Sequence, residues 1–576
     1  MLSRTPKFDA KITDLLNAVP LGERTCSMTG ETWTFDQEHL DWCRRLQVPP
    51  SSISPKTRVK ILLGFATGIA LWKKTHAWTG EPILSCVHPD SPYQIITDKE
   101  WHAFDPSEPS GELDPNQSIL PQIERLAYSI PVPALCDTGT NANTVGVDLV
   151  NAVDCYMGFG GLDMKRLMYF SVGTGCEDSV DLTNNYSLRE SFSSNHCERL
   201  FRCQFTFESR DCLNTAFLFD CRNCEFCFGA VNQRNKKYLW FHEQLSKEEW
   251  ERRRARADLR SFAVFREWVG RFRDFIEKEA VWPENFNVGS EDSTGDYLSD
   301  CLRCHKGFWQ KGSRDCFWSP FNEQCEGCSF VVWAGHDSDS YSSNVFACQG
   351  MRCCSLGLYS RNLEYCFLCV SCEDCFGCVG LKHKRFHIFN RPYSEEEYWK
   401  RVDEIKTKML ERGEYGMIFS AAMSLMGFPF SAGDSFHGYT ELERKQFGIP
   451  DYDVTKGSVI NPDGSALRSE DIPDHLDHID PSRFVGKPIY DSQAKRFYSV
   501  TPQEFTFYQR HRLPFPRQHF LSRLKNLFVY CNGPFAEESS ICESCGKSLL
   551  VHPNRQFSKR RILCEVCYLA YLEKNG

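Results

Sequence analysis

The chain has 576 residues, of which 41% are hydrophobic and 25% charged, as in an ordinary soluble protein with room for roughly three or four domains. Its 30 cysteines are many for a cytosolic chain but too sparse for a small disulfide scaffold. The net charge of −9 is uneven: residues 482–576 carry 15 Lys and Arg against 7 Asp and Glu, and the first 481 residues carry a net −17. A basic tail on an acidic body favours nucleic acid, an acidic protein or the body itself as the partner of the tail.

The N-terminal stretch MLSRTPKFDAKITDLLNAVP has no apolar segment typical of a secretory signal. The longest apolar run, Ile61 to Trp72, is too short to span a bilayer. We therefore predict no membrane span and a reducing cytoplasmic location. There, CxxC pairs indicate metal ligands or free thiols before disulfides.

Residues 1–110 are predicted to form a ribbon-like module. Its motifs occur in the same order as those of the C-terminal end: WTGEPILSCVHPD corresponds to CESCGKSLLVHPN. At the four ligand positions of a zinc ribbon, this module carries the residues His76, Thr79, Thr97 and Glu100. We therefore predict that it holds no metal.

Residues 111–283 and 284–413 are predicted to be two copies of one cysteine-rich unit. The stretch from Cys224, CEFCFGAVNQRNKKYLWFHEQLSKEEWERR, aligns without a gap with the stretch from Cys372, CEDCFGCVGLKHKRFHIFNRPYSEEEYWKR. This constant offset identifies an internal repeat. Each copy ends in a capping box, at Ser246 and at Ser394, so a helix is expected after each.

The upstream part of each copy favours a β-solenoid. Short apolar runs alternate with small polar residues, and Cys155, Cys176 and Cys197 recur at equal intervals. A recurrence of roughly twenty residues is typical of solenoid coils. The fold class is therefore mainly β: two solenoid-like, cysteine-rich halves, each followed by a helix, between ribbon-like end modules.

Residues 365–380, YCFLCVSCEDCFGCVG, place a cysteine at every third position. We interpret this row as reduced, buried, structural cysteines, because the first copy has Leu218 and Ala230 where the second has Cys366 and Cys378. Additional zinc sites and an iron–sulfur or redox cluster are the two alternatives. The possible additional metal ligands are Cys221, Cys224, Cys227, Cys301, Cys304, Cys325, Cys328, Cys366, Cys369, Cys372, Cys375 and Cys378.

Residues 414–480 are rich in Gly, Pro, Asp and Ser and are predicted to be a connecting segment, followed by a basic module at 481–576. A helix is expected after the capping box of Thr501 and Glu504. The pairs Cys542/Cys545 and Cys564/Cys567 have the spacing of a zinc ribbon. Four thiolate ligands leave no open position on the metal, so the predicted zinc is structural.

The basic module also interleaves cationic with aromatic side chains, a pattern suited to a nucleic-acid backbone and its bases. Its alternative is a solvated basic surface over an aromatic core. The candidate nucleic-acid contacts are Arg510, Arg512, Arg517, Arg523, Lys525, Lys559, Arg560 and Arg561.

The CxxCFGC motifs at Cys224 and Cys372, the capping boxes after them and the terminal CxxC pairs resemble a cysteine-rich zinc-ribbon family of candidate-phylum bacteria with duplicated units. The resemblance implies this architecture and a zinc ribbon, and it implies no reaction. The chain departs from the family where Ser54-Pro55-Lys56-Thr57 replaces a Cys-Pro-x-Cys pair.

The sequence as a whole favours a non-enzymatic, zinc-containing binding or scaffold protein with a protein partner. The first alternative is a nucleic-acid- or ribosome-associated protein that acts through its basic C-terminal ribbon. The second is a redox or carbohydrate-active enzyme. No catalytic residue is predicted, because no phosphate-binding loop, dinucleotide fingerprint or nucleophile–base spacing is present.

Overall fold

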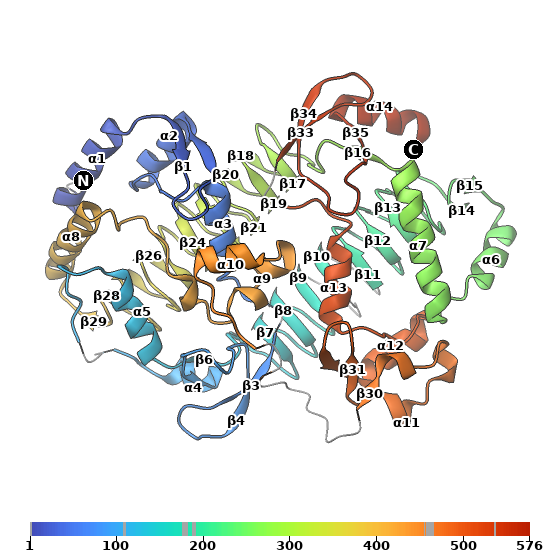
Figure 1. Cartoon of the computed structure of the whole chain (residues 1–576), viewed down its shortest axis with the longest axis horizontal. Coiled ribbons are helices and arrows are strands. Elements are labelled where there is room, and N and C mark those ends of the chain that lie inside the picture. The colour runs from blue at the N-terminus through green and yellow to red at the C-terminus, as the bar shows by residue number, and fades with distance from the viewer. Residues whose placement is uncertain are drawn as a thin grey trace.

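Two ladders of short parallel strands run through the centre of the chain, surrounded by helices and small hairpins (Figure 1). The computed structural model describes residues 3–68, 70–107, 111–174, 182–186, 192–453, 456, 466–534 and 537–576. These residues contain 14 α-helices and 35 strands of two to seven residues, arranged in small sheets. In the described residues, no helix is long and apolar enough to cross a membrane.

The first ladder comprises residues 138–240. Most of its parallel partners share one offset of 12 in residue number, as in Gln204 beside Ala216, and isolated bridges extend it to Phe228 beside Trp240. Its seven-stranded sheet follows the chain order: β7 (Val145–Val150), β8 (Tyr156–Leu162), β9 (Phe170–Thr174), β10 (Leu182–Tyr186), β11 (Phe192–Asn195), β12 (Gln204–Phe207) and β13 (Ala216–Phe219).

The second ladder comprises residues 288–388 and has the same offset of 12, as in Arg361 beside Glu373. A few steps are one residue shorter, such as Tyr341 to Arg352. Its strands are β17 (Gly295–Ser299), β18 (Leu302–His305), β19 (Gly307–Lys311), β20 (Arg314–Phe317), β21 (Asn322–Glu323), β22 (Ser329–Val331), β23 (Ala334–Gly335), β24 (Tyr341–Phe346), β25 (Ser355–Leu358), β26 (Arg361–Glu364), β27 (Glu373–Phe376) and β28 (Arg385–Ile388).

Both ladders are built from residue triplets, illustrated by Arg210, Asp211 and Cys212. Arg210 bridges to the next step, and its N–H donates to the carbonyl oxygen of Cys221 at 3.0 Å. Asp211 is left-handed, with φ +55°, and its N–H donates to Glu198 of the preceding step at 3.1 Å. Cys212 is buried in the interior. Each left-handed residue is strained, and the paired backbone hydrogen bonds on both sides hold it in place.

Because one residue of every triplet is interior, CxxC spacing in a ladder simply marks neighbouring interior positions. The expected recurrence of roughly twenty residues is wrong, since the strands pair at an offset of 12. Cys155 and Cys197 are both interior. The equal spacing of the three cysteines is a multiple of three, which preserves interior placement without matching one step of the ladder. Cys176, midway between the other two, lies outside the described residues.

The two end modules have the same order of elements. The N-terminal module, after α1 (Pro6–Ala18), runs β1 (Gly22–Thr25), β2 (Thr32–Phe35), α2 (Gln37–Leu46), α3 (Pro55–Leu63), β3 (Trp72–Thr75), β4 (Pro82–Ser85), β5 (Ile95–Ile96), α4 (Asp98–Ala103). The C-terminal module runs β31 (Ile489–Asp491), β32 (Arg496–Tyr498), α12 (Pro502–His511), α13 (Phe520–Phe528), β33 (Glu538–Ile541), β34 (Ser548–Val551), β35 (Arg561–Leu563), α14 (Glu565–Asn575).

Each end module pairs with the strand that leads into one ladder. Strand β5 runs parallel to β6 (Val132–Pro133), just before the first ladder, and β35 runs parallel to β16 (Val281–Pro283), just before the second. A helix precedes each of these strands: α5 (Leu120–Ser129) and α7 (Phe262–Glu279). Figure 1 shows α2 and α3 of the N-terminal module beside the second ladder, α4 of the same module near the start of the first ladder, and the ribbon of the C-terminal module above the junction of the two ladders.

The helices predicted from capping boxes are present. They are α6 (Lys247–Arg256), α8 (Glu395–Glu411) and α12, and the serine or threonine before each accepts a backbone N–H as an N-cap. The expected single helix after Ser246 is two helices, α6 and α7, because residues 257–261 between them are not helical. Glu249 and Glu397 bind Arg253 and Arg401 of the next turn instead of reaching back to the cap.

The segment from 414 to 480 packs against the N-terminal module. Tyr439 donates to the carbonyl oxygen of Lys60 at 2.8 Å, and Ser424 donates to that of Gly64 at 2.7 Å. The segment therefore contributes core residues as well as connecting two parts of the chain. The α-helices of this segment are α9 (Ala432–Phe436) and α10 (Glu441–Phe447), and its strand is β30 (Leu467–Arg468). The α-helix and strands of the chain not yet named are α11 (Pro481–Phe484), β14 (Leu239–Trp240), β15 (Glu243–Gln244) and β29 (Arg391–Pro392).

Candidate metal centre and the buried cysteines

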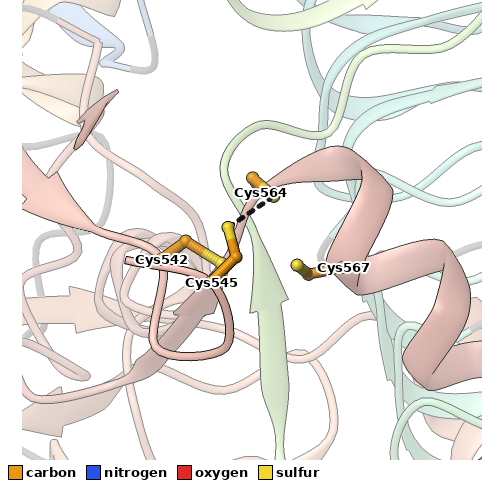
Figure 2. A group of neighbouring side chains, drawn as sticks. All are labelled: Cys542, Cys545, Cys564 and Cys567. Carbon is orange, nitrogen blue, oxygen red and sulfur yellow. Dashed lines mark hydrogen bonds between the residues drawn. The ribbon is translucent and has the colours of Figure 1, made fainter. Parts of the chain in front are cut away.

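The first cysteine pair of the candidate metal centre lies in the turn between β33 and β34. Two backbone hydrogen bonds of 2.8 Å close a tight knuckle at Cys542. Its N–H donates to the carbonyl oxygen of Lys547, and the N–H of Gly546 donates to the carbonyl oxygen of Cys542. Gly546 has φ +76°, a left-handed conformation that glycine adopts without the strain of a side chain. The knuckle turns the Cys542 and Cys545 side chains toward the start of α14 (Figure 2).

The second pair begins α14, with Cys564 as the N-cap residue and Cys567 one turn into the helix. The four Sγ atoms lie within 4.8 Å of one another, and Cys545 Sγ is 3.7 Å from Cys564 Sγ (Figure 2). A tetrahedral site with Zn–S bonds of about 2.3 Å requires sulfur atoms about 3.8 Å apart. The four cysteines could therefore hold a metal ion with little movement.

Backbone N–H groups favour the thiolate form of Cys542. Burial raises its pKa, but hydrogen bonds from the backbone of Cys564, Cys545 and Ser544 outweigh this and lower the pKa to about 6. Thiolates are the form of cysteine that binds metal.

The ribbon is anchored to the junction between the ladders. Register along β16 and β35 places Trp282 beside Ile562, and Glu284 accepts the N–H of Glu565 at 2.9 Å. Three residues further along α14, Tyr568 donates to the buried carboxylate of Asp220 in the first ladder. The ribbon is thus held both by the strand that precedes the second ladder and by the first ladder.

The N-terminal counterpart has the same geometry without thiols. His76 and Gly80 form the same knuckle, Thr97 is the N-cap of α4, and Glu100 lies one turn into that helix. His76 Nε2 is 2.6 Å from Glu100 Oε2, and Thr79 donates its N–H to His76 Nδ1 at 3.1 Å. Hydrogen bonds thus join the four positions that a metal joins in a ribbon.

A related arrangement at the first hairpin was not anticipated. Cys26 follows β1 in a knuckle closed by Gly30, and the N–H of Ser54, the N-cap of α3, donates to Cys26 Sγ at 3.3 Å. Ser54 and Thr57 both donate to Glu31. The sequence signal for this arrangement is the stretch Ser54-Pro55-Lys56-Thr57, in which a serine N-cap precedes a proline at the first helical position.

The ladder cysteines proposed as additional ligands are all buried and free. They lie in three interior clusters with leucine, alanine, valine and methionine. Within the described ranges, Cys542, Cys545, Cys564 and Cys567 are the one group of metal-ligating side chains close enough together to hold an ion. Burial raises the pKa of the interior thiol of Cys203 to about 11, whereas hydrogen bonds from neighbouring cysteines lower the pKa of Cys304 to about 4 and that of Cys372 to about 3.

Interior thiols instead satisfy the ladder backbone. Cys354 Sγ lies 3.4 Å from the carbonyl oxygen of Arg352 and 3.3 Å from that of Leu363, which share its one S–H as acceptors, and it accepts the N–H of Cys366 at 3.4 Å. Ser360, also interior, makes the same three types of contact. Cysteine and serine therefore make the same types of hydrogen bond at these positions, because each supplies one donor and one acceptor to buried peptide groups.

The eight candidate nucleic-acid contacts are not gathered on one surface. Arg560 is 8% exposed, and its guanidinium donates to the carbonyl oxygen of His552 and lies 5.3 Å from the Trp282 ring centroid. Arg517 and Arg523 are half-buried against Phe262 and Tyr169. The exposed members are Arg510, Arg512, Lys525, Lys559 and Arg561. Helix α12 and strand β35, which carry or adjoin four of these, lie well apart in Figure 1.

One feature lies outside the residues singled out from the sequence: a cavity of about 380 Å³ between the ladders, which contains Asp137 and Asp148. No spacing in the sequence indicates it, because its walls come from segments that are far apart along the chain. The triplet pattern separates the interior residues of each ladder from the exterior ones. It does not predict which exterior residues of one ladder face those of the other.

Comparisons with known proteins identify no family. No family model matches the chain, and no curated protein matches it. Among solved structures, the chain is similar to a protein of Desulfovibrio desulfuricans G20 described as an acetyltransferase, with 8% sequence identity and a TM-score of 0.09. That similarity covers 48% of this chain and 81% of the other, and a TM-score this low supports no conclusion on fold or function.

Proposed function

We propose that this chain is a non-enzymatic, cytoplasmic binding or scaffold protein whose C-terminal ribbon holds a structural zinc ion. The observation that carries the proposal is the group of four cysteines at the end of a hairpin and the start of a helix. Its all-thiol donor set and sulfur separations suit zinc, and four protein ligands would leave no position for water or substrate. Zinc would hold the β33–β34 hairpin to α14 and hence to the ladder junction.

We also propose that the ladders are β-solenoids that arose, with the end modules, by duplication. The support is the shared parallel offset of 12 in both ladders and the identical order of elements in the two end modules. Such a framework provides long, regular outer surfaces. These are suited to binding a partner, because each added step extends the surface without changing its geometry.

The ribbon carries the exposed apolar side chains expected of a protein-binding surface. Ile541 and Leu550 are 63% and 55% exposed, and the register of β33 and β34 places them on the same face of the hairpin. Val566 and Leu569, 76% and 53% exposed, lie one turn apart on α14. Exposed apolar groups of this size concentrated in one small module are typical of an interaction site.

The test is capture of partners by the zinc-loaded full chain from a lysate of its source organism, compared with a variant carrying Val566→Ser and Leu569→Ser. Leu442→Ser is the matched control, because Leu442 is 65% exposed on α10, outside the ribbon. We expect a protein retained by the parent and by the control and lost from the double variant. Equal retention by all three would contradict the proposal. Co-purifying nucleic acid that dissociates steeply with salt would favour the nucleic-acid alternative.

A further inference from the structure

The cavity of about 380 Å³ lies where the two ladders face each other. One wall comes from residues 133–162, in and just before the first ladder, and the other from residues 309–370 of the second ladder. Thr67 and Trp101 of the N-terminal module also line the cavity. A volume of this size falls within the range of sites for small organic molecules. The cavity is distinct from the metal centre, and nothing in the proposed scaffold function requires it.

The walls are mainly apolar and strongly aromatic. Among the lining residues are Trp309, Phe321, Trp333, Phe346 and Tyr359. The faces of such rings attract organic cations as well as apolar groups. The wall also includes Trp101, 3% exposed, whose indole N–H has no hydrogen-bond partner in the described part of the chain.

The lining is acidic. It includes the carboxyl groups of Asp137, Asp148 and Glu323 beside one imidazole, that of His336, and no described Lys or Arg lines it. Asp137 accepts the N–H of Leu149 at 2.9 Å, and Asp148 accepts the hydroxyl of Thr67 at 2.7 Å, but neither forms an ion pair with a described residue. Burial raises the pKa of Asp137 to about 8, and the nearby Asp98 and Asp148 carboxyls add to this.

We propose that this inter-ladder cavity binds a small organic cation with an aromatic or aliphatic body. The aromatic walls would hold the body, and an ammonium group would lie beside Asp137 and Asp148. With its pKa at about 8, Asp137 is largely protonated near neutral pH before a cation binds, so a bound ammonium group would favour ionisation of the carboxyl beside it, whereas an anion would face three carboxyl groups. The ligand class follows from this complementarity of charge and from the aromatic lining.

The test uses three probes of similar size on the zinc-loaded full chain: 2-phenylethylammonium, 3-phenylpropan-1-ol and 3-phenylpropionate. Binding is measured by isothermal titration and by quenching of tryptophan fluorescence. We expect the cation to bind at least tenfold more tightly than the alcohol, and the carboxylate to bind most weakly. Equal affinities for the cation and the alcohol, or no binding of the cation up to 10 mM, would overturn the proposal.

Two variants and a control locate the site. Asp148→Asn should weaken the cation about tenfold and leave the alcohol unchanged. Asp163→Asn, an exposed position of the same ladder outside the cavity, should change neither. If Asp148→Asn fails to fold, Leu358→Trp provides an independent test, because it fills the cavity from the second ladder and should abolish binding of all three probes. Retained binding in a folded Leu358→Trp protein would place the probes elsewhere and contradict the proposal.

Discussion

Arg58 and Arg523 occupy the same position, the fourth residue, in α3 and α13, and each guanidinium lies over a tyrosine of a ladder. Arg58 is 4.4 Å from the ring centroid of Tyr341 in the second ladder, and Arg523 is 4.9 Å from that of Tyr169 in the first. Because β5 and β35 pair with the strands leading into the opposite ladders, each end module contacts both ladders. Each arginine therefore contacts the ladder other than the one into which its module's paired strand leads.

Replacing Arg58 with alanine should destabilise the chain strongly. Arg58 is 2% exposed, donates to Tyr341 at 2.6 Å and to Ser342 at 3.0 Å, and packs on aromatic rings. Its loss leaves buried oxygens unpaired and opens a cavity, so we expect the free energy of unfolding to fall by about 3 kcal/mol in denaturant titrations. Arg561→Ala, at an exposed position, is the control and should change stability by less than about 0.5 kcal/mol. Equal effects of the two variants would contradict this role.

Arg523→Ala should show a different signature, because Arg523 lies 3.3 Å from the fully buried carboxylate of Glu504. Removing only the arginine leaves that carboxylate without its cation, at a cost of about 3–5 kcal/mol. The double variant with Glu504→Gln should recover part of the loss. A double-mutant cycle on unfolding free energies measures the coupling, and strict additivity would show that the pair is not coupled.

The interior of a ladder should accept serine for cysteine. Ser360 already makes the contacts that Cys354 makes, so we expect Cys354→Ser to lower the free energy of unfolding by about 1 kcal/mol or less. Cys354→Val adds volume and removes a donor and an acceptor, so about 2–3 kcal/mol is expected. Ser360→Cys is the reciprocal control. A lower stability for Cys354→Ser than for Cys354→Val would show that hydrogen bonding does not decide these positions.

Acid should weaken the contact between the N-terminal module and the segment from 414 to 480. Burial raises the pKa of Glu443, but the hydrogen bond from Lys60, 2.5 Å away, the N–H of Thr440 and nearby His437 outweigh this and lower it to about 2. The folded pKa is below the unfolded value, so this stabilisation is present above about pH 4.5 and is lost as the pH falls toward 2.

The variant Glu443→Gln tests this pH dependence. The difference in unfolding free energy between parent and variant should be about 2 kcal/mol at pH 7 and should shrink between pH 4.5 and 2. A difference that stays constant over this range would mean that ionisation of Glu443 does not contribute.

The sequence predicted features that depend on short-range spacing. The two terminal CxxC pairs come together because a knuckle and a helix N-terminus need few residues each, and the helices after Ser246, Ser394 and Thr501 begin at their caps. In the N-terminal module, His76 and Glu100, which the sequence aligns with two of the ribbon cysteines, are joined by a hydrogen bond.

Features that depend on distant contacts were not predictable in the same way. The offset between paired strands does not follow from the cysteine spacing. Interior positions recur at every third residue, and a cysteine can occupy any of them. The burial of Arg560 depends on Trp282, which lies far earlier in the chain. The inter-ladder cavity requires both ladders and the N-terminal module to be placed before its carboxyl groups can be seen together.

Metal content and thiol state test the central claim most directly. Protein purified anaerobically should contain one zinc ion per chain, show no visible absorbance, and yield all 30 cysteines as thiols after denaturation with a chelator. Removing zinc should disorder residues 538–575 in hydrogen exchange and leave the ladders protected. Several zinc ions, iron with a broad visible band, or a deficit of thiols would contradict the account and make the ladder cysteines a metal or redox site.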